Sequence, residues 1–391
     1  MVSVTMSFAD EFDPGRPPDR PVLQRFASLL APVGPDRLEA MAREARALTL
    51  RHFGRTVRLF APLYLSNECV NNCRYCGFSR DNPILRVTLT VDEVVREARH
   101  LYERGFRHIL LVAGEHPRFV SEGYLQECLR RLRGFIPTLA LEVGPMADDQ
   151  YREMVEAGAE GLVVYQETYD RTTYDSLHTS GPKKNYAWRL QCPERAYRAG
   201  FRRLGIGALF GLADWRREAM ALAAHLDFLQ RHCWKASHTV SFPRLRPHAG
   251  SAQFQPDPAL ALGDRDFVQL LLAFRLCFPE TGIVLSTRET PAFRDAVLPL
   301  GITHLSAGSH TDPGGYTHQG RDDLHLTVKG RRVDLEPAAR TFGEAAGQFE
   351  IADDRSADQM ARLLRQRGFE PVWKDWDEAI LAPPAQTTTH P

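Results

Sequence analysis

Eight short apolar runs alternate with amphipathic stretches along most of this chain. Each run has the length of a buried parallel strand, and each stretch between two runs has the apolar spacing of a helix, which is the pattern of repeated βα units. Eight parallel units close into a barrel whose functional residues lie at the C-terminal ends of the strands. We therefore predict an α/β protein with a (βα)8 TIM-type barrel. The expected strands are Leu59–Leu65, His108–Ala113, Thr138–Val143, Gly161–Gln166, Arg203–Leu209, His238–Phe242, Gly282–Ser286 and Ile302–Ser306.

The barrel is expected at residues 51–316, between two further segments. Residues 1–50 should form an N-terminal helical lead-in, and residues 317–391 a C-terminal extension that packs on the barrel. The polar, weakly periodic sequence from Thr317 to Ile351 is typical of a surface insertion. Helices are expected at Leu23–Leu30, Arg37–Ala47, Val91–Arg104, Glu122–Arg133, Asp148–Ala157, Tyr186–Ala199, Arg216–Arg231, Asp264–Cys277, Pro291–Ala296 and Ala357–Arg367.

Three thiols, Cys69, Cys73 and Cys76, follow the first expected strand in a CxxxCxxC spacing. A cubane iron–sulfur cluster normally takes four thiolates, so a compact set of three predicts a [4Fe-4S] cluster with one iron open to a small ligand. Tyr75 lies between the last two thiols and is placed to lay its ring beside that open iron. Zinc is the alternative, but structural zinc prefers four ligands, and no Cys or His closely follows Cys76 to complete the set. The spacing resembles the cluster loop of radical SAM enzymes.

Charge and hydropathy patterns exclude several classes of partner. The 49 basic side chains balance the 49 acidic ones, so there is no basic field for a phosphate backbone, and we expect no nucleic-acid partner. The longest apolar stretch, Phe267–Phe278, contains Gln269 and Arg275, which indicates a buried helix and not a membrane span. The acidic N-terminus lacks an apolar signal core. We expect a cytoplasmic enzyme that acts on a small molecule.

Polar residues at the ends of the second and fourth expected strands should lie on the same barrel face as the thiols. Gly114 offers a bare backbone and Glu115 a carboxylate suited to an ammonium group, while Glu167 is suited to accept hydrogen bonds from ribose hydroxyls. Arg189, on the next helix, offers a forked donor to a carboxylate. Together these side chains are suited to hold the amine, ribose and carboxylate of S-adenosylmethionine. Each alone is a weak signal, because a strand-end Glu is commonly only solvated.

The remaining strand ends supply a small residue and three arginines. Gly207, in the fifth strand, leaves room for a flat adenine ring near the backbone. Arg244 and Arg246 follow the sixth strand, Arg288 follows the seventh, and Ser306 ends the eighth. An amino-acid substrate needs a cationic partner for its carboxylate, and Arg288 is our first choice because hydroxyls and a carboxylate flank it. Arginines at barrel mouths often pair only with nearby carboxylates, and that alternative stays open for all three.

A chain of ordered motifs makes the sequence similar to one family, the 2-iminoacetate synthases, which are the tyrosine lyases of thiamine thiazole biosynthesis within the radical SAM superfamily. The resemblance runs from Leu38 to Tyr316 and is more specific than CxxxCxxC, which identifies only the superfamily. The stretch Thr317–Ile351 departs from the family by added length. The motifs are Pro62–Asn67, Cys76–Ser79, Val112–His116, Val164–Tyr169, Ser241–Pro247, Ser286–Glu289, Pro313–Tyr316 and Pro371–Asp377.

The resemblance implies that L-tyrosine and S-adenosylmethionine give 2-iminoacetate (dehydroglycine), 4-cresol, methionine and 5'-deoxyadenosine. An adenosyl radical would take hydrogen from the tyrosine amino group, and the Cα–Cβ bond would then break because the cresolyl fragment delocalises its unpaired electron. Arg288, Ser306, Arg244 and Arg246 are the expected catalytic residues. The resemblance also implies thiazole synthase as a partner and an electron donor such as flavodoxin or ferredoxin.

Other assignments stay open as alternatives. The tyrosine lyase that makes diatomic ligands for hydrogenase cofactors carries a second cluster on later cysteines, whereas Cys277 is the last cysteine of this sequence. The tryptophan lyase of peptide antibiotic synthesis and the radical enzymes of deazaflavin synthesis fit the ordered motifs less well. A non-enzymatic metal-binding scaffold is the alternative from a different class.

Overall fold

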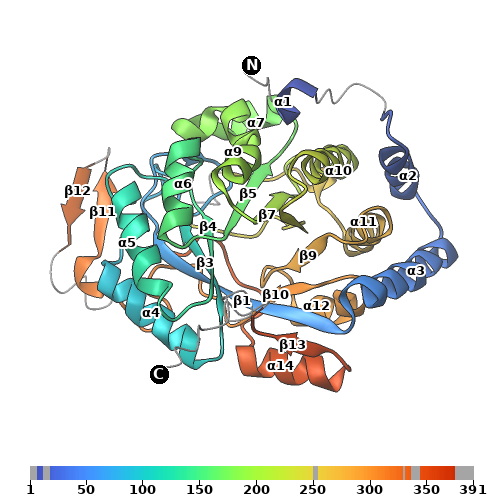
Figure 1. The fold of residues 1–391 in the computed structure, drawn as a ribbon. Coiled ribbons are helices and arrows are strands. Elements are labelled where there is room, and N and C mark those ends of the chain that lie inside the picture. The colour runs from blue at the N-terminus through green and yellow to red at the C-terminus, as the bar shows by residue number, and fades with distance from the viewer. Residues whose placement is uncertain (1–6, 12–17, 250–253, 329–330, 336–343, 375–391) are drawn as a thin grey trace, which may run out of the picture.

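The computed structural model describes residues 7–11, 18–249, 254–328, 331–335 and 344–374. Eight parallel strands form a closed barrel at its centre, because β10 pairs with both β9 and β1 (Figure 1). Each strand begins and ends within three residues of its expected position, which confirms the predicted fold class. The barrel strands are β1 (Thr56–Ser66), β3 (His108–Ala113), β4 (Thr138–Glu142), β5 (Gly161–Glu167), β7 (Arg203–Ala208), β8 (Ser237–Ser241), β9 (Gly282–Leu285) and β10 (His304–Ser306).

Strand β1 closes the barrel because it is long enough to serve several partners. It has 11 residues, and it pairs with β10 through Arg58–Phe60 and with β3 through Ala61–Ser66. Its first residues, Thr56–Arg58, pair in parallel with β13 (Glu370–Val372) from the C-terminal extension. The later half of β1 is buried on both faces, as expected for a strand with helices outside and side chains inside.

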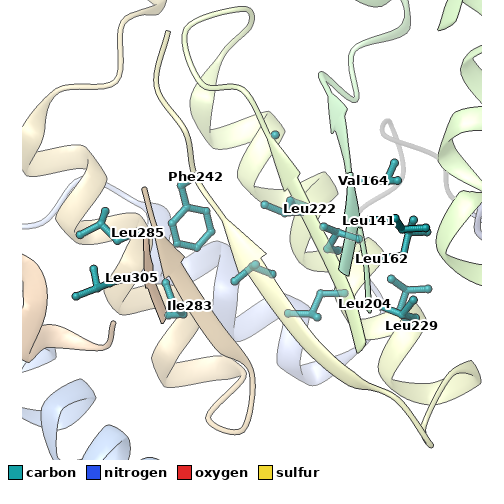
Figure 2. Packing of buried hydrophobic residues seen from close by; sticks show 14 of the residues in the cluster. Leu141, Leu162, Val164, Leu204, Leu222, Leu229, Phe242, Ile283, Leu285 and Leu305 are labelled. Atoms are coloured by element: carbon teal, nitrogen blue, oxygen red, sulfur yellow. The ribbon is translucent and has the colours of Figure 1, made fainter. Parts of the chain in front are cut away.

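The main hydrophobic core lies between the outer face of the barrel and the surrounding helices. Leu141, Leu162 and Leu204 come from three neighbouring strands and belong to one buried cluster with Leu222 and Leu229 of the helix that follows β7 (Figure 2). Side chains alternate between the two faces of a strand. The residues next to these leucines therefore point into the barrel, where the candidate site lies.

Helices follow the strands close to the predicted positions. Thr90 begins the first of them with a capping box, since its side chain accepts from the Glu93 amide while the Glu93 carboxylate accepts from the Thr90 amide. The single helix expected at Tyr186–Ala199 is two helices, because Pro193 lacks an N–H donor and starts a new one. The prediction missed α7. The helices are α4 (Val91–Glu103), α5 (Glu122–Leu132), α6 (Asp148–Ala157), α7 (Arg171–Leu177), α8 (Tyr186–Leu190), α9 (Cys192–Ala199), α10 (Trp215–His232), α11 (Asp264–Cys277) and α12 (Pro291–Val297), with short 3-10 turns η1 (Pro182–Lys184), η3 (Pro258–Leu260), η4 (Leu298–Leu300) and η5 (Arg321–Asp323).

The N-terminal helices pack on α10 and α11. Gln269, a polar residue of the apolar helix α11, donates to the carbonyls of Leu29 and Ala31 at 2.7 Å each and so satisfies the end of α2. In the described part of the chain, no helix has the length and apolarity needed to cross a membrane. The lead-in helices are α1 (Phe8–Glu11), α2 (Pro21–Leu30) and α3 (Pro35–Phe53).

The C-terminal extension returns to the barrel at two places. A hairpin of β11 (His325–Val328) and β12 (Arg331–Asp334) lies at one side of the barrel, beyond α5 in Figure 1. Helix α14 (Ala357–Gln366), which was predicted, leads into β13 at the foot of β1. Within the expected surface insertion, residues 344–351 are exposed or partly exposed and bond to loops at the barrel mouth. Residues 375–391, with the end of the Pro371–Asp377 motif, lie outside the described residues.

Candidate active site

The loop that follows β1 carries the three thiols. Cys73 lies in β2 (Asn72–Cys73), which pairs with β6 (His178–Ser180), and the other two thiols are partly exposed. Burial raises the pKa of the Cys73 and Cys76 thiols, whereas the nearby Lys183 ammonium lowers it. Among the described residues, no three Cys, His, Asp or Glu side chains converge on a single ion. A cubane cluster instead spreads its thiolates over different irons, so this donor set fits a three-thiol [4Fe-4S] cluster.

A buried guanidinium that the sequence analysis did not single out holds the cluster loop in shape. Arg86, 1% exposed, lies 10 residues beyond Cys76. It donates to the carbonyls of Asn67 at 2.6 Å and Ser79 at 2.7 Å, and more weakly to three others. One side chain therefore joins the two ends of the loop. A rigid loop sets the spacing of its three thiols, which a cluster requires.

Gly114 and Glu115 lie against the cluster loop, as predicted. A Cβ at position 114 would come within 2.3 Å of the Glu68 carbonyl oxygen and 3.2 Å of the Cys69 Cβ, so only glycine lets the end of β3 pass the loop. The Glu115 carboxylate accepts from the Asn71 amide at 2.7 Å, and its backbone carbonyl accepts from the Val70 amide at 2.8 Å. Glu115 thus positions the loop, and it remains our proposal for the ammonium ligand.

Glu167 and Arg189 are brought together with a third residue that the sequence analysis missed. Glu167 has a positive φ of 72°, an uncommon conformation for a residue other than glycine. Its carboxylate lies 2.7 Å from Lys183 Nζ and 3.5 Å from Arg189 Nη2. Burial raises the pKa of this carboxyl, but the charges of Lys183 and Arg189 outweigh burial and leave the pKa below its usual value. Glu167 is therefore an ionised acceptor at the barrel mouth.

Tyr75 is fixed by a histidine on the neighbouring strand. Its hydroxyl lies 2.6 Å from His178 Nε2, and Lys183 Nζ is 5.5 Å from its ring centroid. The other ring nitrogen of His178 lies 2.8 Å from the Tyr174 carbonyl, so Nδ1 carries the proton and Nε2 accepts from the phenol. This pairing holds the Tyr75 ring among the cluster-loop side chains. A place beside the open iron remains a proposal.

The space above Gly207 is filled by protein, contrary to the expectation that it admits adenine. A Cβ there would come within 2.7 Å of both the Tyr165 ring and the Ser241 carbonyl oxygen. The glycine is needed because the Tyr165 ring lies across it, inside the barrel. The structure therefore gives Gly207 a packing role, and the prediction of an adenine contact at this residue is not supported.

The three arginines differ in how the protein uses them. Arg244 donates to the carboxylates of Glu289 and Asp264 and to a backbone carbonyl, so protein acceptors occupy its donors. Arg246 donates to Glu289 at 3.0 Å and to the Arg288 carbonyl at 2.5 Å. Arg244 and Arg246 thus follow the alternative in which arginines at a barrel mouth pair with nearby carboxylates. For both we replace the expected catalytic role by a positioning role. The Arg246 contact fixes the backbone that carries Arg288.

Arg288 differs from the other two in its guanidinium, which packs against a ring and has no protein acceptor among the described residues. It lies 3.4 Å from the centroid of Phe349 and, within the described residues, donates no hydrogen bond to a protein acceptor. Burial lowers the pKa of Arg288, while Tyr64 and Glu167 raise it. Ser306 is buried, and its hydroxyl accepts from the Thr287 amide at 3.2 Å. Ser306 therefore supports the loop of Arg288.

Glu142, which the sequence analysis did not single out, ends β4 at the same face. Its pKa is raised to about 7, first by burial and next by the negative charge of Glu167, although Arg288 lowers it. Among the described residues, no hydrogen bond to its carboxyl is present. Tyr64 and Tyr165 lie within electrostatic reach of it. A carboxyl that titrates near neutral pH at a barrel mouth is suited to move a proton.

Residues 344–353 cross the barrel mouth and complete the site. Gln348 accepts from the Gly77 amide through its carbonyl and from the Tyr64 hydroxyl, at 2.8 Å, through its side chain. The Glu350 amide donates to Pro247 at 3.0 Å. The hairpin supports this crossing, since His325 and Thr327 both bond the buried Glu68 carboxylate. Residues 344–353 therefore cover both the cluster loop and Arg288.

Comparison with known proteins agrees with this geometry. Residues 63–224 match the Radical SAM superfamily, and residues 241–370 match the Biotin and Thiamin Synthesis associated domain. The chain is 44% identical to the 2-iminoacetate synthase of Escherichia coli (strain K12), over 90% of this chain and 87% of that protein. It is 42% identical to the 2-iminoacetate synthase of Salmonella typhimurium, over 90% of this chain and 86% of that protein. The X-ray structure of the FeFe-hydrogenase maturase HydG from Carboxydothermus hydrogenoformans is similar with a TM-score of 0.78 and 33% identity, covering 90% of this chain and 76% of that chain.

A closed parallel barrel with a three-thiol loop after its first strand, together with these matches, defines a radical SAM enzyme. Its cofactors are a [4Fe-4S] cluster and S-adenosylmethionine. The chain belongs to the 2-iminoacetate synthase family.

Proposed function

We propose that this enzyme cleaves the Cα–Cβ bond of L-tyrosine to 2-iminoacetate and 4-cresol, with S-adenosylmethionine converted to methionine and 5'-deoxyadenosine. Family membership supports the reaction, and the three-thiol loop supports its initiation. When bound, the cluster supplies the electron that breaks the sulfonium C–S bond. The protein's task is to orient the two substrates and to exclude water.

The observation that carries the proposal is the environment of the Arg288 guanidinium. It lies at the barrel mouth, stacked on Phe349, and among the described residues its donors meet no protein acceptor. Arg244, by contrast, is committed to Glu289 and Asp264. We infer that Arg288 binds the tyrosine carboxylate through its forked donors, while Ser306, Arg244 and Arg246 hold its loop. A planar guanidinium fixed over a ring is already oriented for this contact.

For the cofactor, we propose that Glu115 binds the ammonium group of S-adenosylmethionine and Glu167 its ribose. Glu167 is ionised and held by Lys183, which suits an acceptor of two hydroxyl donors. Arg189 donates through Nε to the Tyr165 carbonyl at 2.8 Å, and we propose that its remaining donors bind the cofactor carboxylate.

Two protein partners belong to the proposal. The product 2-iminoacetate hydrolyses readily, so transfer to thiazole synthase by direct contact would protect it. Reduction of the cluster requires an electron donor such as flavodoxin or ferredoxin.

The decisive experiment is anaerobic incubation of the reconstituted enzyme with tyrosine, S-adenosylmethionine and a reductant. We expect 4-cresol and 5'-deoxyadenosine to form together. Cys73→Ala should abolish both products, while Cys277→Ala, at the end of α11, should leave them unchanged. Cleavage of S-adenosylmethionine without any 4-cresol would refute tyrosine as the substrate while preserving the class of enzyme.

The role of Arg288 needs a separate measurement. Arg288→Ala should weaken tyrosine binding about 10- to 100-fold, the value of a charge-assisted pair, and leave S-adenosylmethionine binding nearly unchanged. Arg217→Ala, at an exposed position of α10, is the control, because it also removes one guanidinium but, within the described residues, does not contact the loop of Arg288. Equal losses for both ligands in Arg288→Ala would reassign the residue to the general structure of the mouth.

A further inference from the structure

A cavity of about 260 Å³ lies inside the barrel at the end opposite the cluster loop. Six barrel strands each contribute a lining residue from their first or second position, which places the cavity at the N-terminal face. It is larger than the cavity of about 150 Å³ that holds benzene in an engineered protein, so it can hold a small organic molecule. The six residues are His108, Gly161, Arg203, His238, Gly282 and His304.

One aromatic side chain lines this cavity and also lies near the candidate active site. Tyr165, near the C-terminal end of β5, lines the cavity and is hydrogen-bonded to Ser241, which lines it as well. The same Tyr165 lies within electrostatic reach of Glu142 and Arg288 at the barrel mouth. Gly207 supplies the space for the ring. We call this cavity the lower chamber and the site around Arg288 at the barrel mouth the upper chamber; Tyr165 is near both.

Two guanidiniums, those of Arg58 and Arg203, line the floor of the lower chamber. Burial lowers the pKa of His304, and the further causes are all cationic groups, led by Arg58 and His108. Arg58 Nη1 lies 3.5 Å from His304 Nε2. Two carboxylates are near: Glu160 pairs with Arg203 at 3.3 Å, and Glu280, whose side chain is 82% exposed, marks the opening to solvent.

His238 adds a polar atom without a partner. It is 9% exposed, and its Nε2 is buried and makes no hydrogen bond within the described residues. Such an atom is costly unless a ligand or water satisfies it. The walls above it are apolar, with Leu110, Ile206 and Val284 among the lining residues. A ligand with one anionic end and a short carbon skeleton matches this arrangement.

We propose that the lower chamber binds a small carboxylate of two or three carbons, the class that includes the imino-acid product and its hydrolysis product glyoxylate. This assignment rests on the proposed function and adds to it a holding site for product on the barrel face opposite the cluster. His238 Nε2 and the Arg58 guanidinium are the groups that would contact the carboxylate.

The test measures binding of ¹³C-glyoxylate to the reconstituted, full-length enzyme by NMR line broadening, with no turnover required. We expect a saturable site that persists in Arg288→Ala and for which acetate competes and neutral acetamide does not. His238→Leu, which removes the unpartnered nitrogen, and Val163→Phe, which fills the chamber, should each weaken binding about tenfold or more. His232→Leu, on the exposed side of α10, should bind as the native enzyme does.

Two further measurements separate the possible outcomes. The cluster absorption of each variant shows that it is folded. Arg288→Ala distinguishes the two chambers: unchanged glyoxylate binding in this variant is expected. Loss of binding in Arg288→Ala, with His238→Leu and Val163→Phe unaffected, would place the anion in the upper chamber and overturn the proposal, as would absence of saturable binding. Failure to form 4-cresol is scored separately, because binding is measured without tyrosine or reductant.

Discussion

Glu142 should make the reaction depend on pH with a midpoint near neutrality. Burial and the charge of Glu167 raise its pKa to about 7, so the ionised fraction rises from about one-tenth at pH 6 to about nine-tenths at pH 8. If Glu142 takes a proton from the tyrosine ammonium group before hydrogen abstraction, kcat for 4-cresol should rise about ninefold over that range. Glu142→Gln keeps the shape of the side chain but cannot accept a proton. It should lose the pH dependence and about 100-fold or more of kcat.

The same substitution should stabilise the fold at high pH. The folded pKa of Glu142 lies above its ordinary value of 4.5. The stability of the native state therefore falls as the pH rises from 4.5 to about 7, and below pH 4.5 the neutral carboxyl carries no such cost. Glu142→Gln should therefore gain about 2 kcal/mol in the free energy of unfolding at pH 8, after allowance for partial exposure, and nothing at pH 4.5. Glu142→Asp is the control for kcat, since it retains a base. A Gln variant with the native pH profile of 4-cresol formation would refute the reasoning.

Three other substitutions test separate parts of the site. Arg86→Ala should leave several buried carbonyls unpaired, so urea unfolding should show a free energy of unfolding lower by about 3 kcal/mol or more. An iron assay should show less iron bound per chain, and normal iron content would contradict the role of Arg86 in the loop. Lys183→Met removes the ion pair of Glu167 and should weaken S-adenosylmethionine binding about tenfold, measured by equilibrium dialysis, with the exposed Lys235→Met as control. Phe349→Ala should raise KM for tyrosine several-fold with little change in S-adenosylmethionine binding, because Arg288 loses the ring that orients it. An unchanged KM would show that residues 344–353 do not contribute to tyrosine binding.

The barrel could be predicted from the sequence because its signal is local. Each strand is a short apolar run and each helix has its own periodicity, so neighbours in sequence determine the pattern. The three thiols were found for the same reason, since they lie within eight residues. The break between α8 and α9 was also visible in principle, because Pro193 marks it.

The rest of the site depends on contacts between distant residues. Phe349 reaches Arg288 from a polar segment without periodicity, and Lys183 reaches Glu167 from a 3-10 turn. No local pattern distinguishes Arg288 from Arg244, because the difference lies in which carboxylates the fold brings near them. The misplaced expectation for Gly207 has the same origin, since the ring that fills its space belongs to another strand.

Closure of the mouth has a consequence for how the enzyme matures. Tyr64, just before the thiols, is separated from its partner Gln348 by 284 positions, and Glu68 is separated from His325 by 257. During synthesis the cysteine loop therefore leaves the ribosome long before the segment that covers it. Strand β1 is likewise synthesised long before its partners β10 and β13. Iron and sulfide thus have open access to the loop throughout this interval. The segment that covers the loop is added last, and in the completed fold Cys73 is buried while Cys69 and Cys76 remain partly exposed.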